Sequence, residues 1–332
     1  MQPSLCVLGA GSWGTALAIQ AARNDTPTVL WGHTPEHIAD LVAQRENTKY
    51  LPGYPFPLSL HATTSLEAAV KQSSIILLSV PSHAFQATLL KIKPFLSGQT
   101  RIAWATKGFN NLNGSLLHEV VENTIGTDIQ TAVLSGPTFA TEVASGLPTA
   151  ITIASLHTEF CNELAGIFHN QTFRPYTSHD IIGVQIGGAV KNVLAIAAGI
   201  ADGLGYGANT RAALITRGLH EIIRLGTQMG GQIETFMGLA GLGDLVLTCT
   251  DNQSRNRRFG LALGSGKTPE QASAEIQQEV EGRLAAKETF LLAQRYGIEM
   301  PISEQTYKVL YENMSPQIAV QNLLGRNPKA ES

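Results

Sequence analysis

Residues 5–14, Leu5-Cys6-Val7-Leu8-Gly9-Ala10-Gly11-Ser12-Trp13-Gly14, decide how the first half of the chain folds. An apolar run typical of a buried strand leads into three glycines spaced G-x-G-x-x-G. Gly9 permits a tight turn, Gly11 lets the backbone approach a pyrophosphate, and Gly14 lets a following helix pack closely on the strand. The free N–H groups that begin this helix suit an anion. We therefore expect a dinucleotide-binding turn, with a plain strand-to-helix turn as the alternative.

The strand-and-helix pattern that begins at this turn continues to about residue 177. Strands are predicted at Leu5–Leu8, Thr28–Trp31, Ile75–Ser79, Ile102–Ala105, Ala132–Ser135 and Ala150–Ala154. Crossover helices are predicted at Ser12–Arg23, Pro35–Arg45, Ser82–Ile92, Gly114–Ile125 and Thr158–His169. This repetition predicts an α/β fold with a doubly wound, Rossmann-type parallel sheet. Leu51–Pro57 contains three prolines, which exclude a central strand, so we expect a surface loop there.

After about His179 the strand signal fades and long helical patterns follow. They cover Ile181–Ala201, Arg211–Met229, Pro269–Gln278, Gly282–Tyr296 and Ser303–Glu312. We therefore expect a Rossmann domain at 1–178, an all-helical domain at 179–325 and a polar, disordered tail at 326–332.

Composition restricts the class of protein. Charged residues make up 15% of the 332 positions and the formal net charge is −3, so no basic field favours a nucleic-acid partner. Cys6, Cys161 and Cys249 are odd in number and lie outside any C-x-x-C pattern, which argues against a disulfide framework or a zinc site and favours a reducing compartment. We expect no bound metal and, since the chain shows no signal-peptide pattern, a cytoplasmic protein.

One stretch, Val184–Ala201, is apolar enough to suggest a membrane helix. Lys191 and Asn192 lie in its middle, however, and glycine and alanine are frequent in it. A buried helix of a soluble domain is the expected structure, without membrane insertion.

The end of the second predicted strand bears on the choice of cofactor. An acidic residue that holds the adenosine 2′-hydroxyl of NAD usually follows this strand. Here the chain reads Trp31-Gly32-His33-Thr34. Because no acid repels a 2′-phosphate and His33 can donate to one, we expect NADP to be accepted at least as well as NAD.

Two lysines stand where chemistry is expected. Lys107 follows a strand at the carboxyl edge, where open α/β sheets bind ligands, although a solvated loop lysine is the alternative. Lys191 lies in an apolar helical segment and leans back over Gly187 and Gly188, whose small size would let a ligand approach. A lysine that merely reaches solvent by its stem is the alternative there.

A glycine-rich segment precedes Asp244, and Thr248 follows one helical turn later if the segment is helical, so both would share a face. Asp244 as a simple helix cap is the alternative. Residues 252–258 then concentrate positive charge, with Ser254 as a candidate N-cap before Arg255. A helix start and an arginine fork suit a phosphate. A solvated basic face fits Arg257 and Arg258 better than Arg255.

Seven motifs, spread in order over almost the whole chain, resemble those of bacterial NAD(P)-dependent glycerol-3-phosphate dehydrogenases. They are GAGSWGTALA at 9–18, VPSH at 80–83, ATKG at 105–108, SGPTFA at 135–140, GGAVKN at 187–192, GLGD at 241–244 and SRN at 254–256. The resemblance implies reversible hydride transfer between NAD(P)H and dihydroxyacetone phosphate, giving sn-glycerol 3-phosphate for phospholipid synthesis. It also implies a helical domain like the C-terminal domain of 6-phosphogluconate dehydrogenase, and it makes a homodimer the expected assembly.

The same resemblance implies the site residues. Those expected to bind the cofactor are Gly9, Gly11, Ser12, Trp13, Gly14, His33, Lys107, Ala140, Arg255, Glu279 and Glu281. At Glu279, where relatives often carry an apolar residue, we expect a backbone contact. Those expected around the substrate are Lys107, Gly136, Thr138, Lys191, Asp244, Ser254, Arg255 and Asn256, to which we add Asn192 and Thr248 as supporting polar groups.

The chemistry of the reaction agrees with these roles. Reduction of a ketone builds negative charge on its oxygen, which a cation stabilises and a proton must neutralise. Lys191 can supply both, with Lys107 as a second cation that lowers its pKa and Asp244 orienting it. Arg255 would hold the phosphate. A dehydrogenase of the β-hydroxyacid or 6-phosphogluconate type and a non-catalytic dinucleotide sensor are the alternatives.

Overall fold

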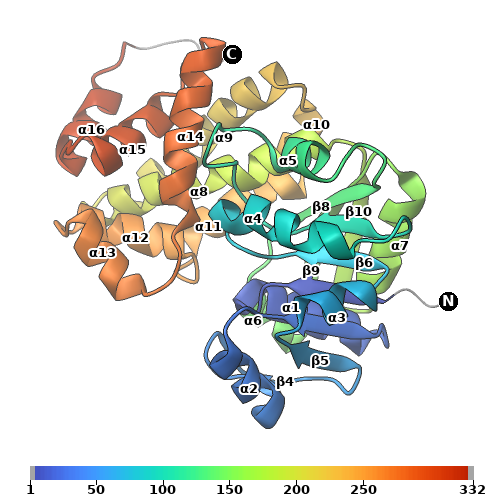
Figure 1. The fold of residues 1–332 in the computed structure, drawn as a ribbon. Coiled ribbons are helices and arrows are strands. Elements are labelled where there is room, and N and C mark those ends of the chain that lie inside the picture. The colour runs from blue at the N-terminus through green and yellow to red at the C-terminus, as the bar shows by residue number, and fades with distance from the viewer. Residues whose placement is uncertain (1–3, 328–332) are drawn as a thin grey trace. The chain divides into compact units, whose positions relative to one another are not determined.

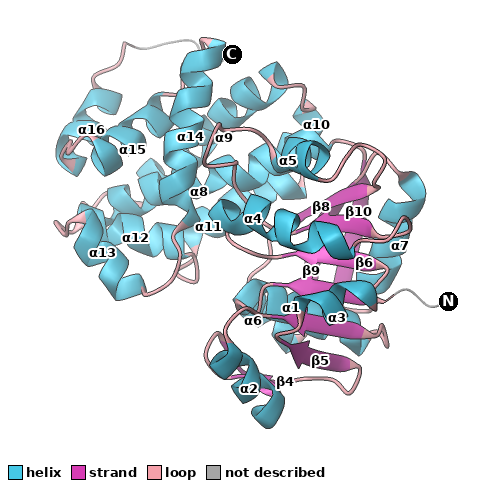
Figure 2. Ribbon diagram, viewed as in Figure 1, coloured by secondary structure: helices cyan, strands magenta, loops and turns pink. Residues whose placement is uncertain are grey.

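The computed structural model describes residues 4–327, and the chain divides into two compact units. The first unit comprises Met1–Asn110 and Ser115–Gln185, and the second comprises Asn111–Gly114 and Ile186–Ser332. Figures 1 and 2 show that the first contains the sheet and the second is built of helices. Of the predicted tail, residues 328–332 lie outside the described residues. Arg326 is described, and its guanidinium forms an ion pair with Glu299.

The first unit is built on an eight-stranded sheet with the order β10-β9-β8-β7-β6-β1-β2-β5. Its strands are β1 Leu5–Leu8, β2 Thr28–Trp31, β5 Leu60–Thr63, β6 Ile75–Leu78, β7 Arg101–Trp104, β8 Thr131–Ser135, β9 Thr149–Ala154 and β10 Phe173–Ser178. The strand after β1 pairs on one side of it and β6 pairs on the other, so the order reverses at β1. Such a reversal is where doubly wound sheets bind ligands, at the carboxyl ends of the strands.

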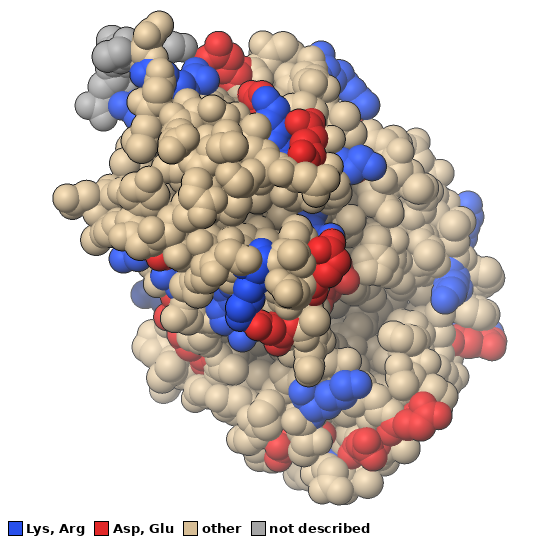
Figure 3. Space-filling view, turned by 90° about the vertical axis from the view of Figure 1, so that its left-hand side faces the viewer, with Lys and Arg blue, Asp and Glu red and all other residues tan. Residues whose placement is uncertain are grey.

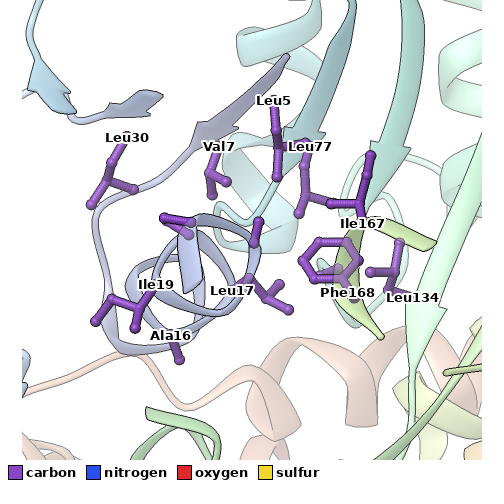
Figure 4. Packing of buried hydrophobic residues seen from close by; sticks show 14 of the residues in the cluster. Leu5, Val7, Ala16, Leu17, Ile19, Leu30, Leu77, Leu134, Ile167 and Phe168 are labelled. Atoms are coloured by element: carbon purple, nitrogen blue, oxygen red, sulfur yellow. The ribbon is translucent and has the colours of Figure 1, made fainter. Parts of the chain in front are cut away.

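The helices of the first unit are α1 Ser12–Arg23, α2 Pro35–Gln44, α3 Leu66–Lys71, α4 Ser82–Ile92, α5 Leu117–Thr124, α6 Ala140–Ser145 and α7 Thr158–Phe168, with a short 3₁₀ turn at Lys93–Phe95. Helix α1 lies against the sheet in an apolar core, where Leu17 packs near Val7 and Phe168 (Figure 4). The four residues of β1 have no exposed surface, as expected for a strand covered on both faces. The Rossmann-type sheet predicted from the sequence is confirmed.

Two details differ from the predicted sheet. Strand β9 pairs with β8 in antiparallel fashion, whereas the other neighbouring pairs are parallel. The segment between β8 and β9, which contains α6, does not return the chain to the amino-terminal ends of the parallel strands. Strand β9 therefore begins near the carboxyl end of β8 and runs in the opposite direction. The predicted surface loop is also wrong in part, because Leu51–Pro55 forms β4 and pairs with β3, Glu46–Asn47. The prolines are tolerated because this sheet has two strands only, each with a free edge.

The second unit consists of helices, as predicted. They are α8 Ile181–Gly203, which begins in the first unit, α9 Ala208–Gln228, α10 Ile233–Met237, a π-helix at Leu239–Gly243, α11 Asp244–Thr250, α12 Arg255–Gly264, α13 Pro269–Ile276, α14 Glu281–Tyr296, α15 Pro301–Tyr311 and α16 Pro316–Leu324. A separate apolar core includes Ile196 of α8, Phe259 of α12 and Val309 of α15.

Helix α8 is long and apolar enough to cross a membrane by length and composition, the only such helix in the part of the chain that is described. Of its most apolar window, 94% is buried inside the structure. On the face drawn in Figure 3, basic and acidic side chains lie in small mixed groups, and most of the surface carries neither.

Candidate active site

The glycine turn after β1 has the shape that a bound pyrophosphate needs. Gly9 has a φ of +121°, and a Cβ there would overlap the carbonyl oxygen of Ser79 at the end of β6. A Cβ at Gly14 would overlap the carbonyl oxygen of Gly9, whereas a Cβ at Gly11 would meet nothing within 4 Å. The positive φ of Gly9 and the close packing at Gly14 agree with the roles predicted for them. Gly11 leaves an open surface, and the approach of a pyrophosphate there stays a prediction.

The start of α1 is open to an anion. Gly11 is its N-cap and supplies no side-chain cap, and no acidic residue lies in the first turn. The first N–H groups of the helix and the positive end of its dipole therefore face outward. The indole N–H of Trp13, at the second position, is buried without a hydrogen-bond partner among residues 4–327. These residues fit a dinucleotide.

A buried asparagine supports this turn. Asn47 has no exposed surface, and its amide donates to the carbonyl oxygen of Ala10 at 3.0 Å and to Oγ1 of Thr15 at 2.8 Å. Its Oδ1 accepts from the backbone N–H of Tyr50, and Ser12 Oγ donates to the Tyr50 carbonyl at 2.7 Å. The loop after α2 is thus tied to the glycine turn. The sequence analysis missed Asn47, because it lies 32 residues beyond Thr15 in no recognisable motif.

His33 is exposed and follows the end of β2. Residues 31–34 carry no acid, and the first acidic residue afterwards is Glu36, in the first turn of α2. His33 is thus exposed with no acid at positions 31–34, which is the arrangement on which the NADP expectation depends. The expectation itself stays a prediction.

Lys107, Gly136 and Thr138 come together at the carboxyl ends of β7 and β8. The Lys107 ammonium donates to the carbonyl oxygen of Gly136 at 3.2 Å, and the Thr138 hydroxyl donates to the same oxygen at 3.2 Å. Gly136 has a φ of +153°, and a Cβ there would lie only 3.1 Å from the α-carbon of Ile151 in β9. Ala140 begins α6 just beyond. Lys107 is half-buried, so the picture of a fully solvated loop lysine does not apply.

Lys191 is buried in the second unit with 6% of its surface exposed. Its Nζ lies 2.5 Å from Oδ1 of Asp244 and 2.8 Å from Oγ1 of Thr248. Asp244 and Thr248 stand one turn apart on α11, on the same face, as the sequence predicts for a helical segment. The carboxylate offsets the cost of burying the ammonium charge, and the lysine does not reach solvent by its stem.

The sequence analysis expected the small size of Gly187 to let a ligand approach, and this explanation is wrong. A Cβ there would overlap the carbonyl oxygen of Ala240 in the π-helix, so this glycine serves the packing of α8 against the Leu239–Gly243 segment. That packing brings the start of α11 next to α8. Asp244 itself is the first residue of α11 and not its N-cap, which is Gly243.

Asn192 is linked to α12 and to the start of α14. Asn256 Nδ2 donates to Oδ1 of Asn192 at 2.8 Å, and the backbone N–H of Gly282 donates to Oδ1 of Asn256 at 2.9 Å. The Asn192 amide in turn donates to the carbonyl oxygen of Gly188. These bonds fix both amides relative to each other and tie the first turn of α14 to α8 and α12.

The basic segment divides into residues with different roles. Ser254 caps α12 by accepting from the N–H of Arg257, as predicted. Arg255 is half-buried, and its Nη1 lies 3.4 Å from the carbonyl oxygen of Glu279. Burial and the neighbouring Arg258 lower the pKa of Arg255, which nevertheless stays a cation. Arg258 is exposed, as expected.

The expectation of a solvated Arg257 is wrong. Its side chain is 9% exposed and forms an ion pair with Asp202 of α8 at 2.5 Å. A pattern of basic residues cannot reveal a partner that lies 55 positions earlier in the chain.

A Rossmann-type unit with an open glycine turn, joined to a helical unit with a buried lysine–aspartate pair, defines the class of dinucleotide-dependent dehydrogenases. Comparison with known proteins narrows this class. Residues 4–161 match the family model of the NAD-dependent glycerol-3-phosphate dehydrogenase N-terminus, and residues 180–321 match that of its C-terminus. The chain belongs to the NAD-dependent glycerol-3-phosphate dehydrogenase family.

Relatives that match over almost their whole length are also glycerol-3-phosphate dehydrogenases. The chain is 57% identical over 331 residues to glycerol-3-phosphate dehydrogenase [NAD(P)+] of Aeromonas hydrophila, covering 99% of each chain. It is 55% identical to the protein of that name from Methylococcus capsulatus, covering 100% of this chain and 99% of the relative. The crystal structure of glycerol-3-phosphate dehydrogenase from Coxiella burnetii is 50% identical with a TM-score of 0.95, covering 98% of this chain and 99% of that one.

Proposed function

We propose that the chain is a glycerol-3-phosphate dehydrogenase that interconverts dihydroxyacetone phosphate and sn-glycerol 3-phosphate with NAD or NADP. The observation that carries the proposal is the buried Lys191–Asp244–Thr248 cluster, in a chain whose full-length relatives bear this name. The nicotinamide supplies or accepts the hydride when the cofactor is bound. The product feeds glycerophospholipid synthesis.

In this proposal Lys191 donates a proton to the C2 oxygen of the substrate during reduction and removes it during oxidation. Its charge stabilises the negative charge that develops on that oxygen. Asp244 and Thr248 hold the ammonium in position through their contacts of 2.5 and 2.8 Å. Asn192 and Asn256, whose amides are fixed by their mutual hydrogen bond, present the remaining polar groups to the substrate.

Arg255 binds the substrate phosphate at the start of α12, where Ser254 caps the helix and the arginine fork matches phosphate geometry. Binding energy from the phosphate, remote from C2, then fixes the reacting carbon for hydride transfer. Lys107, Gly136 and Thr138 complete the proposed substrate contacts. The proposed cofactor contacts are Gly9, Gly11, Ser12, Trp13, Gly14, His33, Lys107, Ala140, Arg255, Glu279 and Glu281.

A steady-state assay tests the proposal. NADPH and NADH oxidation should be measured with dihydroxyacetone phosphate, with 3-hydroxyisobutyrate and 6-phosphogluconate assayed in the oxidative direction. We expect turnover with dihydroxyacetone phosphate and none with the other two substrates. Preferential turnover of either other substrate would indicate a related dehydrogenase, and cofactor binding without any turnover would indicate a dinucleotide sensor.

The setting of the enzyme follows from the same proposal. We infer a cytoplasmic enzyme that acts as a homodimer and inserts into no membrane. Burial of the apolar helix α8 supports the lack of insertion, and the apolar character of the helical unit supports self-association. Fractionation of cells and light scattering of the purified chain are the corresponding measurements.

A further inference from the structure

Arg257 and Asp202 form a buried ion pair that the proposed chemistry does not use. Their side chains are each 9% exposed, and the charged groups lie 2.5 Å apart. Arg211 of α9 binds the same carboxylate through contacts of 3.0 Å to both of its oxygens. A buried charge pair is costly to assemble and by itself weak evidence for stability, so its geometry is the informative part.

The guanidinium of Arg257 joins three separate pieces of the second unit. Its Nε donates to the carbonyl oxygen of Cys249 near the end of α11, at 3.1 Å. One terminal nitrogen donates to Oδ1 of Asn252 in the turn between α11 and α12, and the other donates to Asp202 near the end of α8. The planar guanidinium of Arg257 therefore holds the turn that leads from α11 into α12.

The two helices that carry this ion pair, α8 and α12, also pack closely against each other. A Cβ at Gly199 or Gly203 of α8 would overlap backbone atoms of α12, and a Cβ at Gly260 or Gly264 of α12 would overlap backbone atoms of α8. We call these four residues the glycine contact. With no side chains between them, the two backbones have little freedom to shift.

The two helices carry the two proposed substrate groups. Lys191 lies on α8, and Arg255 is the first residue of α12. We infer that Arg257, held by Asp202 and Asn252, is a positioning residue that fixes the phosphate-binding turn of Arg255 and Asn256 relative to Lys191. The inference rests on the proposed function. It predicts that loosening the fork weakens binding of the substrate phosphate more than binding of the cofactor, because Arg255 is only one of the proposed cofactor contacts.

The test compares Arg257→Lys, which keeps the charge but loses the fork, with Asn252→Ala, which removes one tether at an exposed turn and should fold. Glu275→Gln, which breaks an exposed ion pair with Lys267 in the same unit, is the matched control. For each purified enzyme we would measure the melting temperature, kcat, and KM for dihydroxyacetone phosphate and for NADPH. Inhibition by inorganic phosphate, competing with the substrate, reports on the phosphate site directly.

Arg257→Lys should raise KM for dihydroxyacetone phosphate about tenfold and weaken phosphate inhibition by a similar factor, with a much smaller rise in KM for NADPH, since the other proposed cofactor contacts remain. Asn252→Ala should give about a threefold change in the same direction, since two tethers remain. If both folded variants lose melting temperature but keep the wild-type KM and phosphate inhibition, the pair is only structural and the inference is overturned. If Arg257→Lys does not fold, Asn252→Ala alone decides. Absence of turnover in the wild-type enzyme would instead overturn the proposed function.

Discussion

Lys191 places an ammonium group in a helix that is otherwise almost entirely apolar, and Asp244 and Thr248 are its described partners. Replacing it by methionine, which retains most of the volume, removes both the proton donor and the cation. We expect kcat to fall about a thousandfold, with a smaller change in KM for the substrate. Steady-state kinetics checks this, and a variant that kept wild-type turnover would refute the assigned role.

Arg255 should affect binding more than turnover. Arg255→Ala removes the phosphate fork and should raise KM for dihydroxyacetone phosphate about a hundredfold, with a smaller effect on kcat. Arg258→Ala is the matched control, because Arg258 is adjacent and exposed. Equal effects of the two substitutions would mean that a diffuse positive charge, and no specific contact, attracts the substrate.

His33 decides the choice between cofactors in our account. An acid at this exposed position would repel the 2′-phosphate of NADPH, so His33→Asp should lower kcat/KM for NADPH about tenfold and leave NADH nearly unaffected. Position 33 is the better place for this change than Gly32, where a Cβ would press into Ile38. A strong preference of the wild-type enzyme for NADH would contradict the expectation.

Residue roles could be predicted from the sequence where a short motif carries them. The glycine turn and the cap at Ser254 are local, since the residues that make them lie within a few positions of one another. Asn47 and Arg257 were missed or misread because their partners, Thr15 and Asp202, are distant in the chain. Buried polar residues of this kind acquire their roles from tertiary structure alone.

At the scale of elements, helix α15 depends on a carboxylate from another helix. Glu221 of α9 is 1% exposed and accepts hydrogen bonds from the N–H groups of Ile302 and Ser303 and from the Ser303 hydroxyl. Glu221→Ala would leave the first turn of α15 unsatisfied and should lower the free energy of unfolding by about 2 kcal/mol. Urea denaturation measures this, with Glu234→Ala on α10, whose side chain is exposed, as the control.

The same carboxylate makes stability depend on pH. Burial raises the pKa of Glu221 above the ordinary value of 4.5, although its hydrogen bonds act in the opposite direction. The folded protein then holds this proton more tightly than the unfolded chain does, so the contribution is complete below pH 4.5 and is lost as pH rises through the higher folded value. The stability of the wild type relative to Glu221→Gln should therefore decline with increasing pH, and a difference that grew would contradict the assignment.

Helices and strands could be predicted where residues within the element itself determine its structure. Strand β1 and helix α1 match the predicted boundaries, because an apolar run and a glycine turn act locally. Strand β4 and the antiparallel pairing of β9 were not predicted, since both depend on which partner strand lies beside them. Helix α16, Pro316–Leu324, was also missed, being a short helix with only one buried residue.

At the scale of the whole molecule, the proposed homodimer gives a direct measurement. Light scattering at micromolar concentration should report twice the 35.4 kDa mass of the chain. Since apolar surface drives most stable self-association, the dimer should persist in high salt. A mass equal to one chain under these conditions would contradict the proposal.

The glycine contact between α8 and α12 has a consequence for how substrate length can change during evolution. A Cβ at any of the four positions would overlap the backbone of the other helix, so the helices cannot slide by a small step without a clash, and a shift by one full turn is about 5.4 Å. We therefore expect that related enzymes differ in the distance between the reacting carbon and the phosphate site by whole helical turns, and not by small amounts. Substrate analogues lengthened by single methylene groups should lose activity abruptly at the first addition, and a gradual decline would show that the two helices adapt.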